Sequence, residues 1–218
     1  MRRSISWIAG GLAALLWLGG AAQAARTTDP LTTEGVLLRE VSLGDLVADA
    51  LREAGSAQAA LVNATQFKPG TIPAGKVTGG DVSGLLINPG RPWVVSAITG
   101  DCLKAALERA LSRLPAESAH FLQVSGLKVT YNPNAASGTR VTDLRIGGQP
   151  VQGAVEYRVA MPEDLAKGGS GYFTVPCFTK DSIRPGATGT LAEAVAAYVD
   201  AHATLNYGDA NRIVAADG

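Results

Sequence analysis

Apolar side chains recur with helical spacing in three segments of the chain. In each segment they fall at positions i, i+3, i+4, i+7 and i+8, which places them on one face of a helix. These segments are residues 43–51, 103–111 and 191–199. Ser42 is a candidate N-cap for the first, and Thr190 with Glu193 has the capping-box spacing before the third. We therefore expect three helices, each with one buried face.

Short apolar runs separated by Gly, Asn and Pro predict strands between these helices. The runs are residues 59–62, 93–98, 121–124, 127–131, 141–146, 154–160 and 172–178. Helices cluster toward the two ends and strands fill the middle, so the order is not a regular βαβ alternation. The pattern predicts an α+β fold, a single domain with a mixed β-sheet and three main helices.

The N-terminus has the anatomy of a secretory signal peptide. Arg2 and Arg3 precede an apolar run over residues 5–18, and the small residues Ala22 and Ala24 flank Gln23. We expect residues 1–24 to be removed after Ala24, giving a periplasmic or secreted protein.

Two other interpretations of this N-terminus are weaker. The apolar run is short for a membrane span of about 20 residues, so no membrane anchor is expected after cleavage. Residues 4–6 fit a twin-arginine signal poorly, which favours Sec export. The polar residues 25–35 are then expected to be a flexible lead-in to one domain at residues 36–218.

Charge and cysteine content narrow the function classes. The chain has 19 basic and 19 acidic residues, which favours neither nucleic acid nor an anionic membrane surface as a partner. Cys102 and Cys177 either form a disulfide in an oxidising compartment or are two separate buried thiols. Together with His120 and His202 they show no metal-ligand spacing, so we expect no metal and no cofactor.

Motifs of the common catalytic classes are absent. The chain has no G-x-S-x-G, Walker A or H-E-x-x-H motif. A Ser-His-Asp arrangement using His120 or His202 is conceivable, but an ordinary structural histidine accounts for each equally well. The glycines at 168, 169 and 171 allow close backbone approach to a ligand, or simply a tight connection between strands.

Seven segments of the chain, in order, match motifs of one family: residues 40–52, 60–63, 72–78, 98–108, 121–127, 140–160 and 168–172. The first has Glu40, Gly44, Asp45 and Leu46 where the family pattern has E-x-x-x-G-N-L. The fifth reads F-L-Q-V-S-G-L against the pattern F-x-Q-V-S-G-L. From about residue 36 to its C-terminus, the chain resembles the C-terminal domain of the 5′-nucleotidase family.

The resemblance implies a division of labour. In the family, an N-terminal metallophosphoesterase domain holds the metals and hydrolyses the ester, and the C-terminal domain binds the nucleoside between two phenylalanines. Because this chain starts at the C-terminal domain, it is not expected to hydrolyse phosphate esters alone. A separately encoded metallophosphoesterase is the expected partner, and a nucleotide or small anion is the expected ligand.

The resemblance also implies a set of substrate-binding positions, and several of them depart from the family. The candidate binding residues are Asn63, Gly90, Arg91, Gly168, Gly169 and Ser170. Pro89 and Asp164 stand where the family has its two stacking phenylalanines, and the family's arginine is either missing or replaced by Lys68. Each lost ring removes about 1–3 kcal/mol of stacking. Phe67, Trp93 or Tyr172 either replaces this surface or belongs to the core.

Three functions remain open from the sequence. The first is a binding module for a nucleotide or small anion, linked to nucleotide hydrolysis by another chain. The alternative is a non-catalytic structural or partner-binding protein with a degenerate pocket. The third is an enzyme with new chemistry from Arg91, Asp164 and Ser170.

Overall fold

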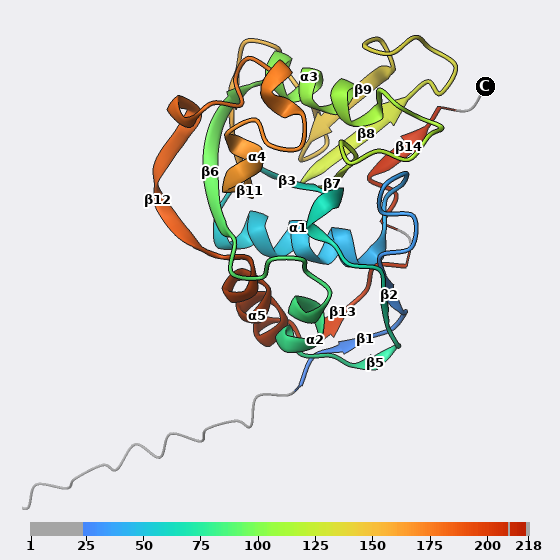
Figure 1. The fold of residues 1–218 in the computed structure, drawn as a ribbon, viewed down its shortest axis with the longest axis vertical. Helices are drawn as coiled ribbons and strands as arrows, with labels where there is room; N and C mark the ends of the chain where they lie inside the picture. The colour runs from blue at the N-terminus through green and yellow to red at the C-terminus, as the bar shows by residue number, and fades with distance from the viewer. Residues whose placement is uncertain (1–23, 209, 217–218) are drawn as a thin grey trace, which may run out of the picture.

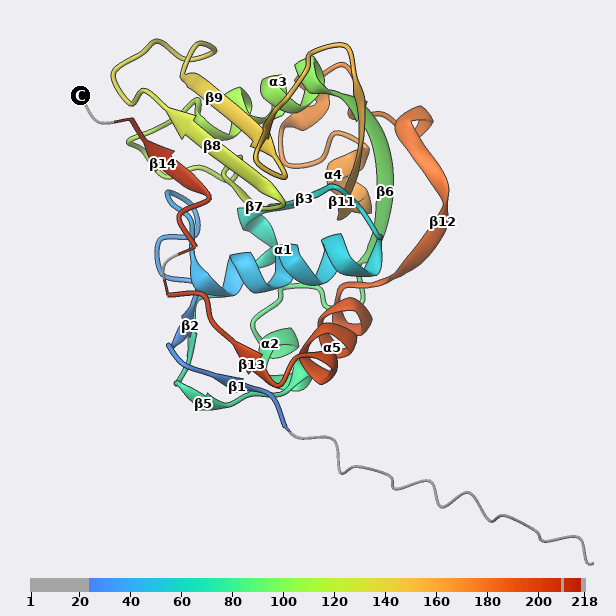
Figure 2. The ribbon, with the colours of Figure 1, turned by 180° about the vertical axis from the view of Figure 1, so that it is seen from behind.

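The structure is a computed structural model that describes residues 24–208 and 210–216 (Figure 1). The expected signal peptide, apart from Ala24, lies outside the described residues. In Figures 1 and 2, β1 (Arg26–Thr27) lies near one end of the domain and β14 (Ile213–Ala215) near the other.

A five-stranded mixed sheet forms the centre of the molecule. Its strand order is β12-β6-β11-β3-β7. The strands are β3 (Ala59–Asn63), β6 (Pro92–Thr99), β7 (Leu122–Ser125), β11 (Glu156–Pro162) and β12 (Ile183–Thr190). β3 and β11 are parallel and the other pairs are antiparallel. The predicted α+β fold with a mixed sheet is confirmed.

Each face of this sheet carries its own hydrophobic core, because successive side chains of a strand point to opposite faces. In β3, Ala59 and Leu61 join one core, whereas Ala60 and Val62 join the other. All five residues of β3 are buried, as expected for a strand covered on both faces.

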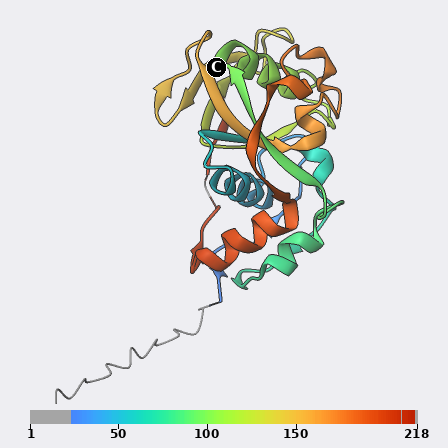
Figure 3. The ribbon, with the colours of Figure 1, turned by 90° about the vertical axis from the view of Figure 1, so that its left-hand side faces the viewer.

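Helices cover both faces. They are α1 (Ser42–Ala54), α2 (Gly79–Gly84), α3 (Gly100–Leu111), α4 (Glu163–Ala166) and α5 (Leu191–Ala201), with 3-10 turns η1 (Ala64–Gln66), η2 (Tyr172–Thr174) and η3 (Lys180–Ser182). α1 packs against β3 and β7, and α5 and α2 lie beyond it, farther from the strands (Figure 3). α3 contributes its apolar stripe to the opposite core.

Smaller sheets complete the fold. A four-stranded sheet has the order β10-β9-β8-β14, and its other strands are β8 (Leu127–Tyr131), β9 (Val141–Ile146) and β10 (Gln149–Pro150). The remaining two sheets are β13-β1-β5 and β2-β4, formed by β2 (Leu31–Thr32), β4 (Thr71–Ile72), β5 (Gly75–Lys76) and β13 (Thr204–Leu205).

Three local expectations were wrong. The segment predicted to be a flexible lead-in forms β1 and β2, with Leu31 fully buried. Residues 172–178 begin with η2 instead of a strand, and β12 was missed. Ser42 is the first residue of α1, not its N-cap, because its hydroxyl bonds the β2 segment, accepting from the Thr32 amide at 2.9 Å. The capping box of Thr190 and Glu193 is confirmed.

Cys102 and Cys177 form a disulfide between α3 and the segment after η2, with their Cα atoms 6.2 Å apart. This resolves the question that the sequence left open. Within the described residues, no helix has both the length and the hydropathy that a bilayer span requires.

Candidate functional site

The strand directions bring three chain segments to one edge of the central sheet. β3 and β11 are parallel, so both end at this edge, and β6 is antiparallel to β11, so it begins there. Asn63 is the last residue of β3, Arg91 precedes β6, and residues 163–171 follow β11. Candidate residues that are far apart in the sequence thus meet for a topological reason.

Asn63 and Ser170 are in direct contact. The buried Asn63 amide donates from Nδ2 to Ser170 Oγ at 2.8 Å. Thr65 Oγ1 lies 3.0 Å from the same hydroxyl, and Gln66 Nε2 donates to Asn63 Oδ1 at 3.2 Å. Gln66 thus holds the Asn63 side chain, and Asn63 together with Thr65 fixes the position of the half-buried Ser170. Thr65 was missed from the sequence, which carries no signal for a partner 105 residues away.

Arg91 and Asp164 form the second pair at this edge. Arg91 Nη1 lies 2.6 Å from Asp164 Oδ2, and the two side chains are 29% and 32% exposed. Arg91 Nε and Asp164 Oδ1 are both buried, and neither has a hydrogen-bond partner among the described residues. Asp164 thus supplies a carboxylate that neutralises Arg91.

The glycine loop, residues 168–171, needs glycine at positions 168 and 169 because backbone atoms pack closely against them. Gly168 has φ +85°, and a Cβ there would lie 2.9 Å from the Phe173 Cα. A Cβ at Gly169 would lie 2.6 Å from the Asp164 carbonyl oxygen, which accepts from the Gly169 amide. The loop is therefore a tight turn that carries Ser170, itself at φ +53°. Gly90 lies in an exposed turn whose neighbour Pro89 accepts from the Ala192 amide, in the first turn of α5.

Two side chains outside the candidate set support the glycine loop. Arg109 of α3 donates from Nε to the Gly171 carbonyl at 3.2 Å and from Nη2 to His120 Nε2 at 3.0 Å. Because arginine only donates, His120 Nε2 accepts and the neutral ring carries its proton on Nδ1. Burial and the nearby guanidinium of Arg109 lower the pKa of His120. His120 is thus a structural support, and no sequence pattern signals this contact.

Of the two arrangements that the sequence left open for Phe67, Trp93 and Tyr172, the structure shows the second, in which they belong to the core. Phe67, Trp93 and Tyr172 are all buried in the two cores, so none is an open stacking surface. Phe173, directly after the glycine loop, is instead 77% exposed. Lys68 donates to the Gly84 carbonyl at 3.1 Å, at the end of α2.

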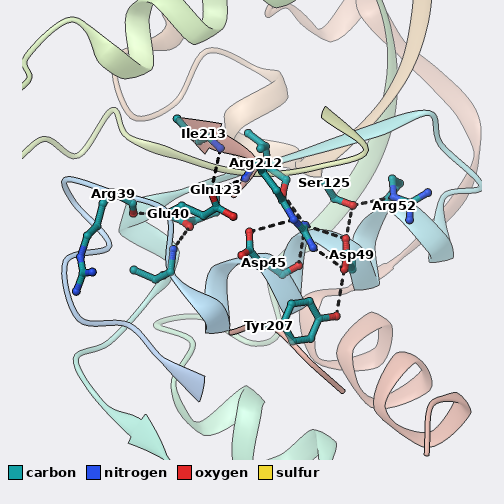
Figure 4. A network of polar contacts seen from close by, with 12 residues as sticks. Arg39, Glu40, Asp45, Asp49, Arg52, Gln123, Ser125, Tyr207, Arg212 and Ile213 are labelled. Atoms are coloured by element: carbon teal, nitrogen blue, oxygen red, sulfur yellow. Dashed lines mark hydrogen bonds and ion pairs between the residues drawn. The ribbon is translucent and has the colours of Figure 1, made fainter. Parts of the chain in front are cut away.

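A second polar cluster is a mostly buried charged network around α1, the helix that packs against β3 and β7 (Figure 4). Arg212 binds both carboxylate oxygens of Asp49 at 2.9 Å, and Glu40 Oε2 accepts from the Arg212 and Ile213 amides at 2.7 and 2.9 Å. Asp45 lies 3.4 Å from Arg212 Nε. Burial raises the pKa of Asp45 to about 9, opposed by Arg212 and reinforced by Glu40. The network ties the C-terminal strand to α1.

The described residues contain no group of three or more His, Cys, Asp or Glu side chains placed to hold a metal ion. His202 rests on Tyr198, with ring centroids 4.1 Å apart, and lies 3.4 Å from Glu53. Fold and site together define an α+β domain with a polar edge on its central sheet.

Comparisons with known proteins agree with the motif order found in the sequence. The sequence profile of the family "5'-nucleotidase, C-terminal domain" matches residues 22–178. This chain therefore belongs to the 5′-nucleotidase C-terminal domain family.

Individual relatives are much longer than this chain. It is 34% identical over 149 residues to the trifunctional nucleotide phosphoesterase protein YfkN of Bacillus subtilis, covering 64% of this chain and 10% of that protein. It is 28% identical over 167 residues to an apyrase of Aedes albopictus, covering 70% of this chain and 29% of the relative. The structure of a 5′-nucleotidase precursor from Thermus thermophilus superposes with a TM-score of 0.76 at 28% identity, covering 90% of this chain and 40% of that one.

Proposed function

We propose that this chain is an exported substrate-handling module, which binds a nucleotide or another small anionic ligand at the edge formed by Asn63, Arg91 and Ser170. One observation supports the proposal: at this edge the Asn63 amide bonds to the Ser170 hydroxyl, and Arg91 pairs with Asp164 of the same segment, residues 163–171. Gly168 and Gly169 shape the loop beside them, and the exposed Phe173 offers a ring.

Export is part of this proposal. The N-terminal pattern of Arg2, Arg3 and a short apolar run supports it, and so does the disulfide, since disulfides persist in oxidising compartments. Hydrolysis is assigned to a separate metallophosphoesterase. The chain's own residues bind and orient the ligand.

Calorimetric titration with AMP, UMP and adenosine tests the binding. We expect AMP and UMP to bind more tightly than adenosine, because only they carry the phosphate that a guanidinium recognises. Arg91→Ala should weaken AMP binding about tenfold or more. Arg145→Ala is the matched control, because Arg145 forms a similar pair with Asp143 in β9 of the four-stranded sheet. No heat with any of the three ligands at millimolar concentration contradicts the nucleotide proposal.

A second candidate function is a partner-binding protein whose pocket has degenerated. The Arg91–Asp164 pair favours it, because Asp164 already neutralises the cation that would attract an anion. Under this alternative, the chain forms a defined complex with a metallophosphoesterase domain, measured by light scattering, although no nucleotide binds. Arg91→Ala then leaves complex formation unchanged.

A further inference from the structure

An apolar cavity of about 590 Å³ opens beside the candidate site and includes Thr32 of β2 in its lining. Its walls come from residues 32–37, 64–65, 67 and 69–71, with Ile87 and Glu117 completing the rim. Most of the lining is apolar and comes from Val36, Leu37, Phe67, Pro69 and Ile87. Its size falls in the range of small-molecule sites, which are largely apolar with a few polar groups.

Hydrogen bonds hold these walls in place. The Thr33 amide donates to the Gly70 carbonyl at 3.1 Å, and its hydroxyl accepts from the Gly70 amide at 2.9 Å. The Ser118 amide donates to the Leu37 carbonyl at 2.8 Å, and the Ile87 amide to the Gln66 carbonyl at 2.8 Å. All four parts of the wall are therefore linked, and a ligand would find the cavity already formed.

Exposure of apolar atoms marks this cavity as more than a packing defect. Ile87 is 55% exposed at the rim, although isoleucine is among the residues most often buried. An open apolar surface of this kind is typical of an interaction site.

The charges at the cavity select among possible ligands. Glu34 and Glu117, both exposed, are the charged residues of its lining. The Lys68 ammonium is turned away toward the Gly84 carbonyl. Arg39 lies against the Gly35 backbone and lines the adjoining cavity, which shares Thr32 and Glu34 with this one, but it is not part of this cavity's lining. An apolar interior with an acidic rim disfavours a phosphate and complements a positive charge.

We propose that this cavity is a second ligand site, which takes a small molecule with an apolar body and a cationic head. The body contacts Val36, Leu37 and Ile87, and the head faces Glu34 and Glu117. The site differs in chemistry from the edge at Arg91, so it stands whether or not a nucleotide binds there. Thr65 belongs to both, because it lines the cavity and bonds to Ser170.

A matched series of three probes tests the proposal: 4-phenylbutylamine, 4-phenylbutanol and 4-phenylbutyrate. They share one apolar body and carry a cationic, neutral or anionic head. Affinities are measured from ¹H–¹⁵N correlation NMR titrations of the whole protein. We expect the amine to bind most tightly, the carboxylate most weakly, and the shifted amides to cluster in residues 32–37 and 64–71.

Variants separate the two parts of the proposal. Glu34→Gln with Glu117→Gln should weaken the amine about three- to tenfold and leave the alcohol unchanged, because two exposed charges contribute modestly. Ile87→Ser should weaken all three probes. Its control is Val155→Ser, since Val155 is similarly exposed, at 43%, and does not line the cavity.

Two results would overturn this inference. One is equal affinity for all three probes in the wild type, since the acidic rim would then select nothing. The other is a dimer in sedimentation that Ile87→Ser dissociates, because a second copy would then cover the cavity.

Discussion

At the scale of single residues, Asp45 is the departure from the family pattern with the clearest physical consequence. The family pattern has asparagine here, whereas this chain has a carboxyl group that is 1% exposed and lies beside Glu40, Asp49 and Arg212. An amide at this position would carry no charge at any pH. The aspartate therefore makes the stability of this buried network depend on pH.

Asp45→Asn is expected to stabilise the protein, and increasingly so at higher pH. The folded pKa of about 9 lies above the unfolded value of 3.8, so the folded state binds more protons between them. The free energy of unfolding of the wild type thus falls, relative to the variant, as pH rises from about 4 to about 9. Urea denaturation at pH 5, 7 and 9 measures this, and we expect a change of at least about 2 kcal/mol.

Asp81→Asn is the control with the opposite sign. Hydrogen bonds from the Thr78 side chain and backbone lower the pKa of Asp81. Its contribution is therefore present above about pH 4 and lost as pH falls through its folded pKa. The same pH trend for both variants would contradict our account of Asp45.

Gly168→Ala should destabilise the loop that carries Ser170. The residue has φ +85°, and its Cβ would meet the Phe173 backbone, which cannot move as a flexible side chain would. We expect a loss of about 1–3 kcal/mol in thermal or urea unfolding. Gly84→Ala, with open space around its Cβ, is the control and should be neutral or slightly stabilising. Equal effects at both positions would count against the loop's role.

The candidate site shows which residues can be found from a sequence. Asn63, Arg91 and Ser170 were proposed because they occupy motif positions, and the ends of β3 and β11 and the start of β6, to which they belong, lie at one edge of the sheet. Thr65, Arg109 and His120 were missed, because their contacts join segments that no local pattern relates. Phe173 was missed because exposure of a ring is decided by how the loop packs. The binding role of the site stays a prediction.

At the scale of elements, one side chain joins the C-terminal strand to the first helix. Arg212 immediately precedes β14, and it donates to Asp49 of α1 and to the Val124 carbonyl of β7. β14 pairs with β8 in parallel, so the network also holds an edge of the smaller sheet.

Arg212→Leu is expected to cost about 3 kcal/mol, because it leaves the mostly buried Asp49 carboxylate, whose side chain is 14% exposed, without its ion-pair partner. Urea denaturation measures the loss. The control is Arg145→Leu, which removes an exposed pair and should cost less than about 1 kcal/mol. A loss at Arg212 as small as that at Arg145 would show that the network contributes little to stability.

The predicted helices and strands agree with the structure where the hydrophobic pattern within a single segment is enough to specify the element. The three long helices were predicted because their apolar stripes repeat over two turns or more. β12 was missed because Pro185 and the small or polar residues 186–188 show no alternation of apolar and polar side chains. This strand forms because it pairs with β6. Residues 172–178 were assigned as a strand from composition, but Tyr172, Val175 and Phe178 pack into the core from turns and irregular backbone.

At the scale of the whole molecule, the disulfide closes a long loop. Cys102 and Cys177 are separated by 75 residues, and the loop between them includes β7, β8, β9 and β11. Cross-linking so distant a pair restricts the unfolded chain more than the folded one.

Replacing both cysteines by serine is expected to destabilise the protein by about 4 kcal/mol, from the loop-closure entropy of this separation. Urea denaturation of the oxidised wild type and the double variant measures the difference. Reducing the wild type with dithiothreitol should reproduce most of the loss. A reduced protein as stable as the oxidised one would contradict this account.

The sequence by itself determined the family, the α+β class and the positions of the main helices and central strands, because apolar periodicity and motif order are local properties of a chain. Only the tertiary structure decided that residues 25–35 pair into strands, that the cysteines join, and that Asp164 neutralises Arg91. It also decided which aromatic rings are core and which one is exposed. Each of these depends on contacts between residues far apart in sequence, and folding alone sets those distances.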